Sequence, residues 1–192
     1  MRIFVGVELP DEVKDAASLA ADALGRRLAD AGLRLDAKWV PRDNLHITLW
    51  FIGEVIDDRV RAIQDALAPA SAVPAFDVRL AGLGAFPLSG APRVFWIGLR
   101  SGADGMTALN AEVGARLAPL GCEPERRPYS AHVTIARAKE LASRSDAAGI
   151  RRIAHSLAAD AGLSRVSAVT LFRSRLSPKG AAYEPLLRVP LR

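Results

Sequence analysis

Two of the three histidines in this chain lie in near-copies of one short string, His46-Ile47-Thr48-Leu49 and His132-Val133-Thr134-Ile135. Each string alternates polar and aliphatic residues, a pattern typical of a β-strand, in which successive side chains point to opposite faces. Each histidine therefore shares a face with the threonine two positions later. An imidazole beside a hydroxyl fills an apolar core poorly, but it can move a proton while a phosphate oxygen is held.

A single His-x-Thr string also has an ordinary structural interpretation, the polar face of a half-buried sheet. Duplication favours chemistry, because displacement at phosphorus needs one group to accept a proton and another to donate one. Histidine, with an unperturbed pKa near ~6.5, suits both roles at neutral pH. We therefore predict that His46 and His132 are brought face to face as an acid–base pair, with Thr48 and Thr134 holding phosphate oxygens.

The hydrophobic periodicity predicts the elements that must position these strings. A helix opens near Asp11 with its apolar stripe at Val13, Ala17, Ala20, Leu24 and Leu28, and three later helices contain residues 57–67, 106–117 and 150–157. Strands are expected at 2–8, 46–52, 76–83, 93–99, 132–135, 166–176 and 183–190.

The order of helix, loop and histidine strand occurs twice, and the two strings are 86 residues apart. We therefore predict an α+β fold of two pseudo-symmetric lobes. Each lobe is expected to be an antiparallel sheet with helices on its outer face, and the two surround a central cleft. Residues 1–192 are expected to form a single bilobal domain.

Composition limits the class of protein. Half of the 192 residues are hydrophobic, which is enough to bury a sizeable core, and no apolar run approaches the length of a membrane span. The apolar start of the chain is too short for a signal peptide and is broken by Glu8 and Pro10. A single cysteine, Cys122, allows neither an internal disulfide nor a cysteine metal cage. We expect a cytoplasmic protein without membrane partners.

The net charge of +5 is unevenly distributed, because residues 151–192 hold eight Arg or Lys against two acidic residues. Of the 26 basic residues 22 are Arg, whose planar guanidinium suits phosphate. A solvated face and a nucleic-acid surface explain this surplus equally well.

With its flanks included, the segment Lys38–Glu54 resembles the first signature of the bacterial and archaeal RNA 2′,3′-cyclic phosphodiesterases, also called 2′-5′ RNA ligases, of the two-histidine phosphoesterase superfamily. Ala131–Arg137 resembles the second signature. Ala131 stands where the family usually has Pro, and Gly6 where it usually has Ala. The remaining blocks are similar at Arg2–Val5 with Leu9-Pro10, at Ala91–Gly98, and from Ser174 through Gly180 to Tyr183, so the match spans nearly the whole chain.

The resemblance implies a bilobal fold and a metal-independent opening of a terminal 2′,3′-cyclic phosphate to a 2′-phosphate. It implies His132 as base and His46 as acid, with the roles exchanged in the reverse, ligating direction. The implied substrates are RNA ends bearing the cyclic phosphate, or cyclic nucleotides, and no cofactor is expected. We expect the chain to act as a monomer.

The resemblance also assigns phosphate binding to Arg137, although strict alternation along a strand would place it opposite His132 and Thr134. A strand end or a β-bulge would remove this conflict, and a structural ion pair is the other interpretation. Trp50 has the parity of His46 and is predicted to stack on a base, whereas Phe51 has core parity and is predicted to pack. Tyr183 and Ser174 are weaker candidates.

Two other functions are compatible with some of these features. One is an RNA-end-binding protein with little catalytic activity. The other is a metal hydrolase, which is poorly supported because the three histidines are far apart and show no HxH or HExxH spacing.

Overall fold

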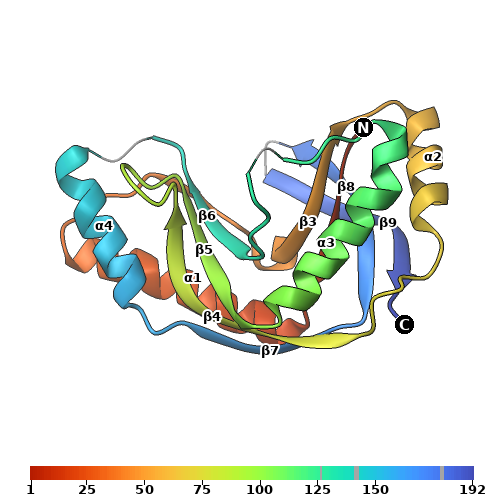
Figure 1. Cartoon of the computed structure of the whole chain (residues 1–192). Coiled ribbons are helices and arrows are strands. Elements are labelled where there is room, and N and C mark those ends of the chain that lie inside the picture. Colours follow the sequence, from red (N-terminus) through yellow and green to blue (C-terminus); the bar gives the residue numbers. More distant parts are fainter. Residues whose placement is uncertain (126, 141–142, 178–179) are drawn as a thin grey trace.

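Over the residues that it describes, a computed structural model shows four α-helices and a curled antiparallel sheet arranged as two lobes that diverge from a common junction (Figure 1). It describes residues 1–125, 127–140, 143–177 and 180–192. The helices are α1 (Asp11–Asp30), α2 (Asp57–Leu67), α3 (Ala103–Leu117) and α4 (Arg144–Ser156). The strands are β1 (Arg2–Glu8), β2 (Ala37–Trp39), β3 (His46–Glu54), β4 (Phe76–Phe86), β5 (Val94–Ser101), β6 (Val133–Ala138), β7 (Asp160–Val166), β8 (Ala168–Ser177) and β9 (Gly180–Pro190).

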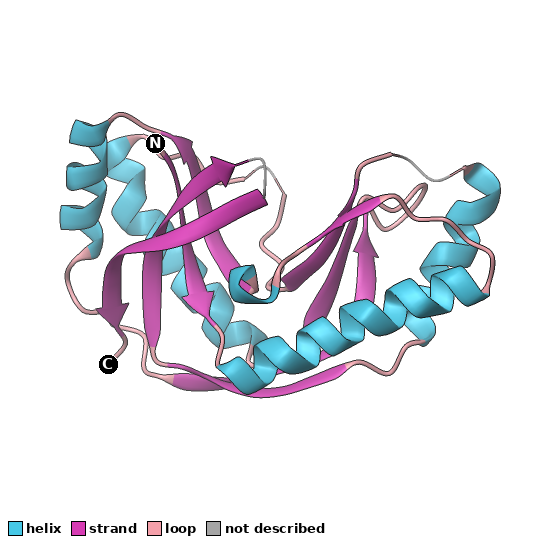
Figure 2. Ribbon diagram, turned by 180° about the vertical axis from the view of Figure 1, so that it is seen from behind, coloured by secondary structure: helices cyan, strands magenta, loops and turns pink. Residues whose placement is uncertain are grey.

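The strands join in the order β7-β4-β5-β6-β3-β1-β8-β9, and β2 adds to β6. The first lobe contains β3, β1, β8 and β9 with helices α2 and α3. The second lobe contains β6, β5, β4, β7 and β2 with helices α1 and α4. Seen from behind, α1 runs along the base of the second lobe (Figure 2). The predicted α+β fold of two lobes is therefore confirmed.

The lobes are not the two halves of the sequence. Helix α1 comes from the first half but packs on β6 and β7 of the second lobe, while α3 from the second half packs on β3 of the first lobe. Each lobe therefore needs both halves of the chain before its sheet is covered.

Helix α1 forms because its apolar residues recur at helical spacing and bury one stripe. Val13, Ala17, Leu24 and Leu28 are buried as predicted, but the stripe takes Ala21 in place of Ala20. In β1 the alternate residues Ile3, Val5 and Val7 are buried in the main core. Their neighbours Phe4 and Gly6 lie on the opposite face of the sheet, which we call the site face.

Strand β7 was not predicted as an element separate from β8. Its sequence, Asp-Ala-Gly-Leu-Ser-Arg-Val, contains few residues typical of strands. In the structure Gly162 has a φ of 93°, a backbone conformation that is more common in turns. The strand forms because β4 supplies its hydrogen-bonding partner along residues 76–81.

Candidate active site

The junction of the two lobes is made by the middle residues of the two His-x-Thr strings. Ile47 of β3 and Val133 of β6 are antiparallel register partners, and both are almost fully buried. Their flanking residues must then emerge on the opposite face of the sheet. One pair of buried aliphatic residues therefore brings four polar side chains together, with His46 on the Thr134 side and Thr48 on the His132 side.

Both histidine rings are oriented by the same backbone contact. Nδ1 of His46 lies 2.7 Å from the carbonyl oxygen of Asn44, and Nδ1 of His132 lies 2.7 Å from that of Ser130. A carbonyl only accepts, so Nδ1 carries the hydrogen and Nε2 is the atom left for proton transfer. Nε2 of His46 lies 3.0 Å from Oγ1 of Thr48.

Aromatic rings hold each imidazole in place. The centroid of the His46 ring lies 4.8 Å from that of Phe4 and 5.1 Å from that of Tyr183, which meets it edge-on. His132 has Phe86 edge-on at 5.4 Å and Trp96 at 6.2 Å. These contacts restrict rotation of both rings, and they place Tyr183 beside the pair.

The surroundings lower the pKa of both histidines below the ordinary value near 6.5. For His46 burial is the largest cause, and the positive charges of Arg137 and His132 act in the same direction. For His132 burial again dominates, Arg137 adds to it and Glu125 opposes it. The lowered pKa of each ring favours its neutral form, which can accept a proton. A bound phosphate anion shifts their pKa upward, because it favours the charged form.

A β-bulge in β3 reverses the predicted faces of Trp50 and Phe51. Thr48 pairs with Gly6 of β1, but the next partner, Val5, pairs with Trp50, so the chain gains one residue at Leu49. Trp50 therefore lies with Val5 on the face of the sheet opposite the site face, and it packs against α3. Its ring is so close to Gly114 of α3 that a Cβ added to this glycine would lie 2.6 Å from it. The prediction that Trp50 reaches the site is wrong, and Phe51 takes the site face.

Substitution tests this exchange of faces. Trp50→Ala is expected to lower the free energy of unfolding by about 3 kcal/mol, because it empties the contact with α3. Phe51→Ala is the matched control and is expected to cost less than about 1 kcal/mol, since Phe51 is 41% exposed. Urea unfolding of both variants gives the comparison. A larger loss for Phe51→Ala than for Trp50→Ala would contradict the assigned faces.

Side chains from other elements satisfy the backbone groups that the bulge in β3 displaces. The hydroxyl of Tyr129 donates to the carbonyl oxygen of Thr48 at 3.2 Å, and Nδ2 of Asn110 on α3 donates to that of Leu49 at 2.8 Å. Buried carbonyls without a partner would be costly. The two side chains therefore stabilise the bulge, although neither was predicted.

A second bulge, in β6, resolves the conflict over Arg137. Thr134 pairs with Trp96, but Ala136 pairs with Phe95 and Arg137 with Val94, so the extra residue falls at Ile135. Phe95 is fully buried, which leaves Val94 and Arg137 on the site face. The guanidinium lies near enough to lower the pKa of both histidines. The structure thus brings together every predicted site residue except Trp50.

Other predicted features lie near or away from the pair. Ser174 pairs with Arg2 and Tyr183 at the edge of the first lobe, whereas residues 178 and 179 of the same family block lie outside the described part of the chain. His155 is exposed on α4. Among the described residues, no three His, Cys, Asp or Glu side chains gather where they could hold a metal ion, and no described helix is long and apolar enough to span a membrane.

Comparison with known proteins shows which family and which relatives this chain is similar to. The model of the LigT-like phosphoesterases matches residues 7–96 and again residues 97–183, so each match contains one His-x-Thr string. The RNA 2′,3′-cyclic phosphodiesterase of Aeropyrum pernix is 36% identical over 79% of this chain and 85% of its own length. The enzyme of that name from Archaeoglobus fulgidus is 33% identical over 97% of this chain and 98% of its own length.

Solved structures show the same fold. TT0787 of Thermus thermophilus superposes with a TM-score of 0.79 at 29% identity, covering 100% of this chain and 98% of that protein. Escherichia coli LigT complexed with 3′-AMP superposes with a TM-score of 0.70 at 25% identity, covering 99% of this chain and 97% of LigT.

Proposed function

This chain belongs to the LigT-like phosphoesterases, and from that membership we propose that it is an RNA 2′,3′-cyclic phosphodiesterase. The observation that carries the proposal is the pairing of Ile47 with Val133, which gathers two histidines and two threonines at one junction. Relatives of that name match most of the chain, and a crystal structure of E. coli LigT holds 3′-AMP.

The proposed reaction opens the cyclic phosphate by water. One neutral histidine takes a proton from the water at Nε2, and the water oxygen forms a bond to phosphorus while the bond to the ribose 3′-oxygen breaks. The other histidine, charged, gives its Nε2 proton to that oxygen. The products are a 2′-phosphomonoester and a free 3′-hydroxyl. We assign His132 as base and His46 as acid. In 2′-5′ ligation a 5′-hydroxyl replaces water as the nucleophile and each histidine keeps its role, so the roles exchange only when the 2′-5′ bond is cleaved back to the cyclic phosphate.

Two further groups are proposed to hold the phosphate. Thr48 and Thr134 stand beside the histidines on the site face and can donate to non-bridging oxygens, where negative charge grows. Arg137 supplies a positive charge close to both histidines. No step requires a metal ion. We also propose that residues 1–192 act as one bilobal domain, as a monomer, in the cytoplasm.

Thr48→Val and Thr134→Val are each expected to lower kcat/KM roughly 10- to 150-fold, because each removes one hydrogen bond to the charged phosphate. Steady-state rates on a 2′,3′-cyclic nucleotide measure this loss. Thr107→Val is the control, since Thr107 lies on the exposed side of α3 and its hydroxyl donates only locally to the carbonyl of Ala103. Equal kcat/KM values in all three variants would contradict a role of Thr48 and Thr134 in holding the phosphate.

Turnover distinguishes the enzyme from a protein that only binds RNA ends. An RNA oligonucleotide ending in a 2′,3′-cyclic phosphate is incubated with the wild-type chain, and the terminal group is followed over many equivalents. Multiple turnovers are expected. Stoichiometric binding without turnover would contradict the proposal and favour the binding protein.

A further inference from the structure

Two cations lie side by side on the site face of the second lobe. Lys38 of β2 and Arg137 of β6 are antiparallel register partners. Partners in such a pair lie about 5 Å apart and point to the same face of the sheet, so Lys38 shares the site face with Arg137. Both residues are exposed. Like charges directly opposite each other destabilise a sheet, and an anion bound between them would relieve this repulsion.

The residue after Lys38 supports this placement independently. Trp39 pairs with Ala136, which is fully buried in the core. The ring of Trp39 packs on α1, since a Cβ added to Gly25 would lie 3.5 Å from it. Successive residues of a strand point to opposite faces. Packing of Trp39 against the helix therefore leaves Lys38 on the site face.

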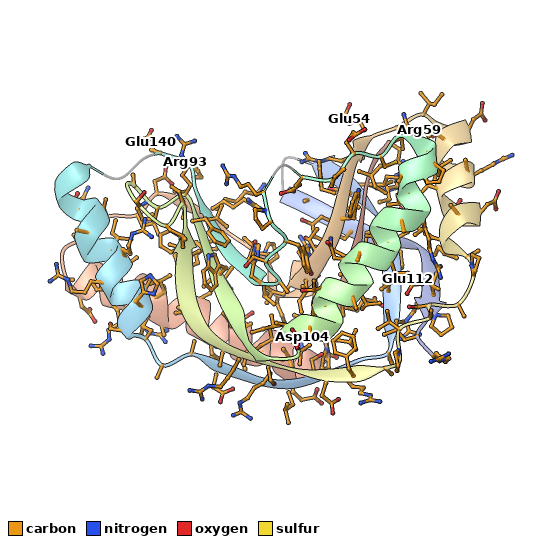
Figure 3. All side chains as sticks on the ribbon, viewed as in Figure 1. Glu54, Arg59, Arg93, Asp104, Glu112 and Glu140 are labelled. Carbon is orange, nitrogen blue, oxygen red and sulfur yellow. The ribbon has the colours of Figure 1, made fainter. Side chains whose placement is uncertain are left out.

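The carboxylates at the outer end of the second lobe do not neutralise this pair. The charged residues there are four cations and two carboxylates, Lys38, Arg93, Arg137, Lys139, Asp36 and Glu140. Asp36 is paired with Lys139 at 3.0 Å. Figure 3 shows Arg93 and Glu140 at the outer end of the lobe, just past the ends of β5 and β6. Within the described part of the chain, no ion pair joins a carboxylate to Lys38 or Arg137.

Lys38 and Arg137 differ in their distance from the reacting centre. The charge of Arg137 lowers the pKa of both His46 and His132, whereas Lys38 is not among the described residues that do so. On β6 Arg137 is the next residue on the site face after Thr134, a step of about 7 Å along the strand. Lys38 lies one strand further across. It is therefore placed for an anion next to the reacting phosphate, not for that phosphate itself.

An RNA substrate supplies such an anion. Its terminal nucleotide carries the cyclic phosphate on one side of the ribose and the 5′-phosphodiester on the other. A phosphodiester has a single negative charge, which one ammonium group balances. The flexible stem of a lysine can also follow a backbone that varies in conformation. A cyclic nucleoside phosphate without a 5′-phosphate lacks this second anion.

We propose that Lys38 binds the phosphodiester on the 5′ side of the terminal nucleotide, and that this contact makes the site select RNA ends over free cyclic nucleotides. The proposal rests on the proposed function and adds a residue that recognises the chain beyond its cyclic phosphate. A contact with the phosphate backbone does not depend on base sequence. It weakens as the salt concentration rises.

The experiment compares two dinucleotides that end in a 2′,3′-cyclic phosphate and differ only in the charge of their linkage. One has a phosphodiester and the other a neutral methylphosphonate, with a deoxynucleoside on the 5′ side of both. In the wild-type chain kcat/KM is expected to be roughly 2- to 5-fold higher for the phosphodiester, the range for one exposed ion pair. Lys38→Gln is expected to remove this preference. Lys38→Arg, which keeps the charge, is expected to retain it.

The dependence on salt gives a second readout. For the phosphodiester substrate, the logarithm of kcat/KM is expected to fall with the logarithm of the salt concentration. Loss of one phosphate contact in Lys38→Gln should make this slope shallower by about 0.7, the value for single strands. Arg26→Gln is the matched control, since Arg26 is an exposed cation on α1, the helix that packs on β6 and β7 of the same lobe. It should leave the preference and the slope unchanged.

A ratio of the two kcat/KM values that stays at the wild-type value in Lys38→Gln overturns the proposal. This holds even if activity falls, because an equal loss on both substrates would place Lys38 on the reacting phosphate. Failure of the proposed function looks different, because the wild-type chain would then turn over neither dinucleotide. In that case binding of the two uncleaved dinucleotides, measured by calorimetry, still decides. The same ratio of affinities in wild type and Lys38→Gln overturns the proposal.

Discussion

His132→Ala is expected to lower kcat for opening of a 2′,3′-cyclic phosphate roughly 10²- to 10⁴-fold, and His46→Ala is expected to do the same. Each substitution removes the only proton carrier for one half of the reaction, either activation of water or protonation of the leaving oxygen. The double variant is expected to be little worse than either single variant, because the two residues act as a unit. Single-turnover rates at saturating substrate measure the effect on chemistry.

His155→Ala is the control for loss of a histidine without loss of the site, since His155 is exposed on α4. Its rate should equal that of the wild type. Circular dichroism shows whether the site variants remain folded. Near wild-type kcat in both His46→Ala and His132→Ala would exclude the acid–base pair.

Arg137→Gln is expected to lower kcat/KM roughly 10- to 150-fold, the range for a hydrogen bond to a charged group. It should also move the pH dependence. Arg137 lowers the pKa of His46 and of His132, so its removal raises both pKa values. Each limb of the bell-shaped pH profile of kcat/KM then shifts to higher pH. The catalytic acid stays protonated up to a higher pH, and the catalytic base becomes deprotonated only at a higher pH.

Lys139→Gln is the matched control for this charge, since Lys139 follows two residues later but pairs with Asp36 at 3.0 Å. It should leave both limbs of the profile in place. A profile for Arg137→Gln that shifts to lower pH, or does not move, would contradict the proximity of Arg137 to the histidines.

The hydrophobic periodicity was sufficient to predict the main elements and the two-lobed fold. The four polar residues of the His-x-Thr strings were also predictable, because alternation alone sets their common face and the buried residue between them pairs the strands. The hydrophobic periodicity could not predict which helix packs on which lobe. The periodicity of α1 and α3 shows that each helix buries one apolar stripe. It does not show that α1 covers the sheet of the lobe that holds His132, or that α3 covers the sheet of the lobe that holds His46.

The β-bulges at Leu49 and Ile135 are the places where predictions from strand alternation fail. In Thr48–Ile52 the sequence is apolar at every position after the threonine, so nothing in it shows where the alternation slips. Trp50 and Phe51 were therefore assigned to the wrong faces, while Arg137 needed the family resemblance to be considered at all. The one available signal was the equal spacing of Phe51 and Arg137 from their histidines. It becomes informative only once one bulge is known.

The most direct test of the acid–base pair is the identity of the product from a dinucleotide ending in a 2′,3′-cyclic phosphate, incubated with the wild-type chain in excess chelator. Separation of the two phosphomonoesters by chromatography shows which P–O bond has broken. We predict the 2′-phosphate with a free 3′-hydroxyl, formed at the same rate with and without chelator. Formation of the 3′-phosphate, or loss of turnover in chelator, would contradict a metal-independent pair that protonates the 3′-oxygen.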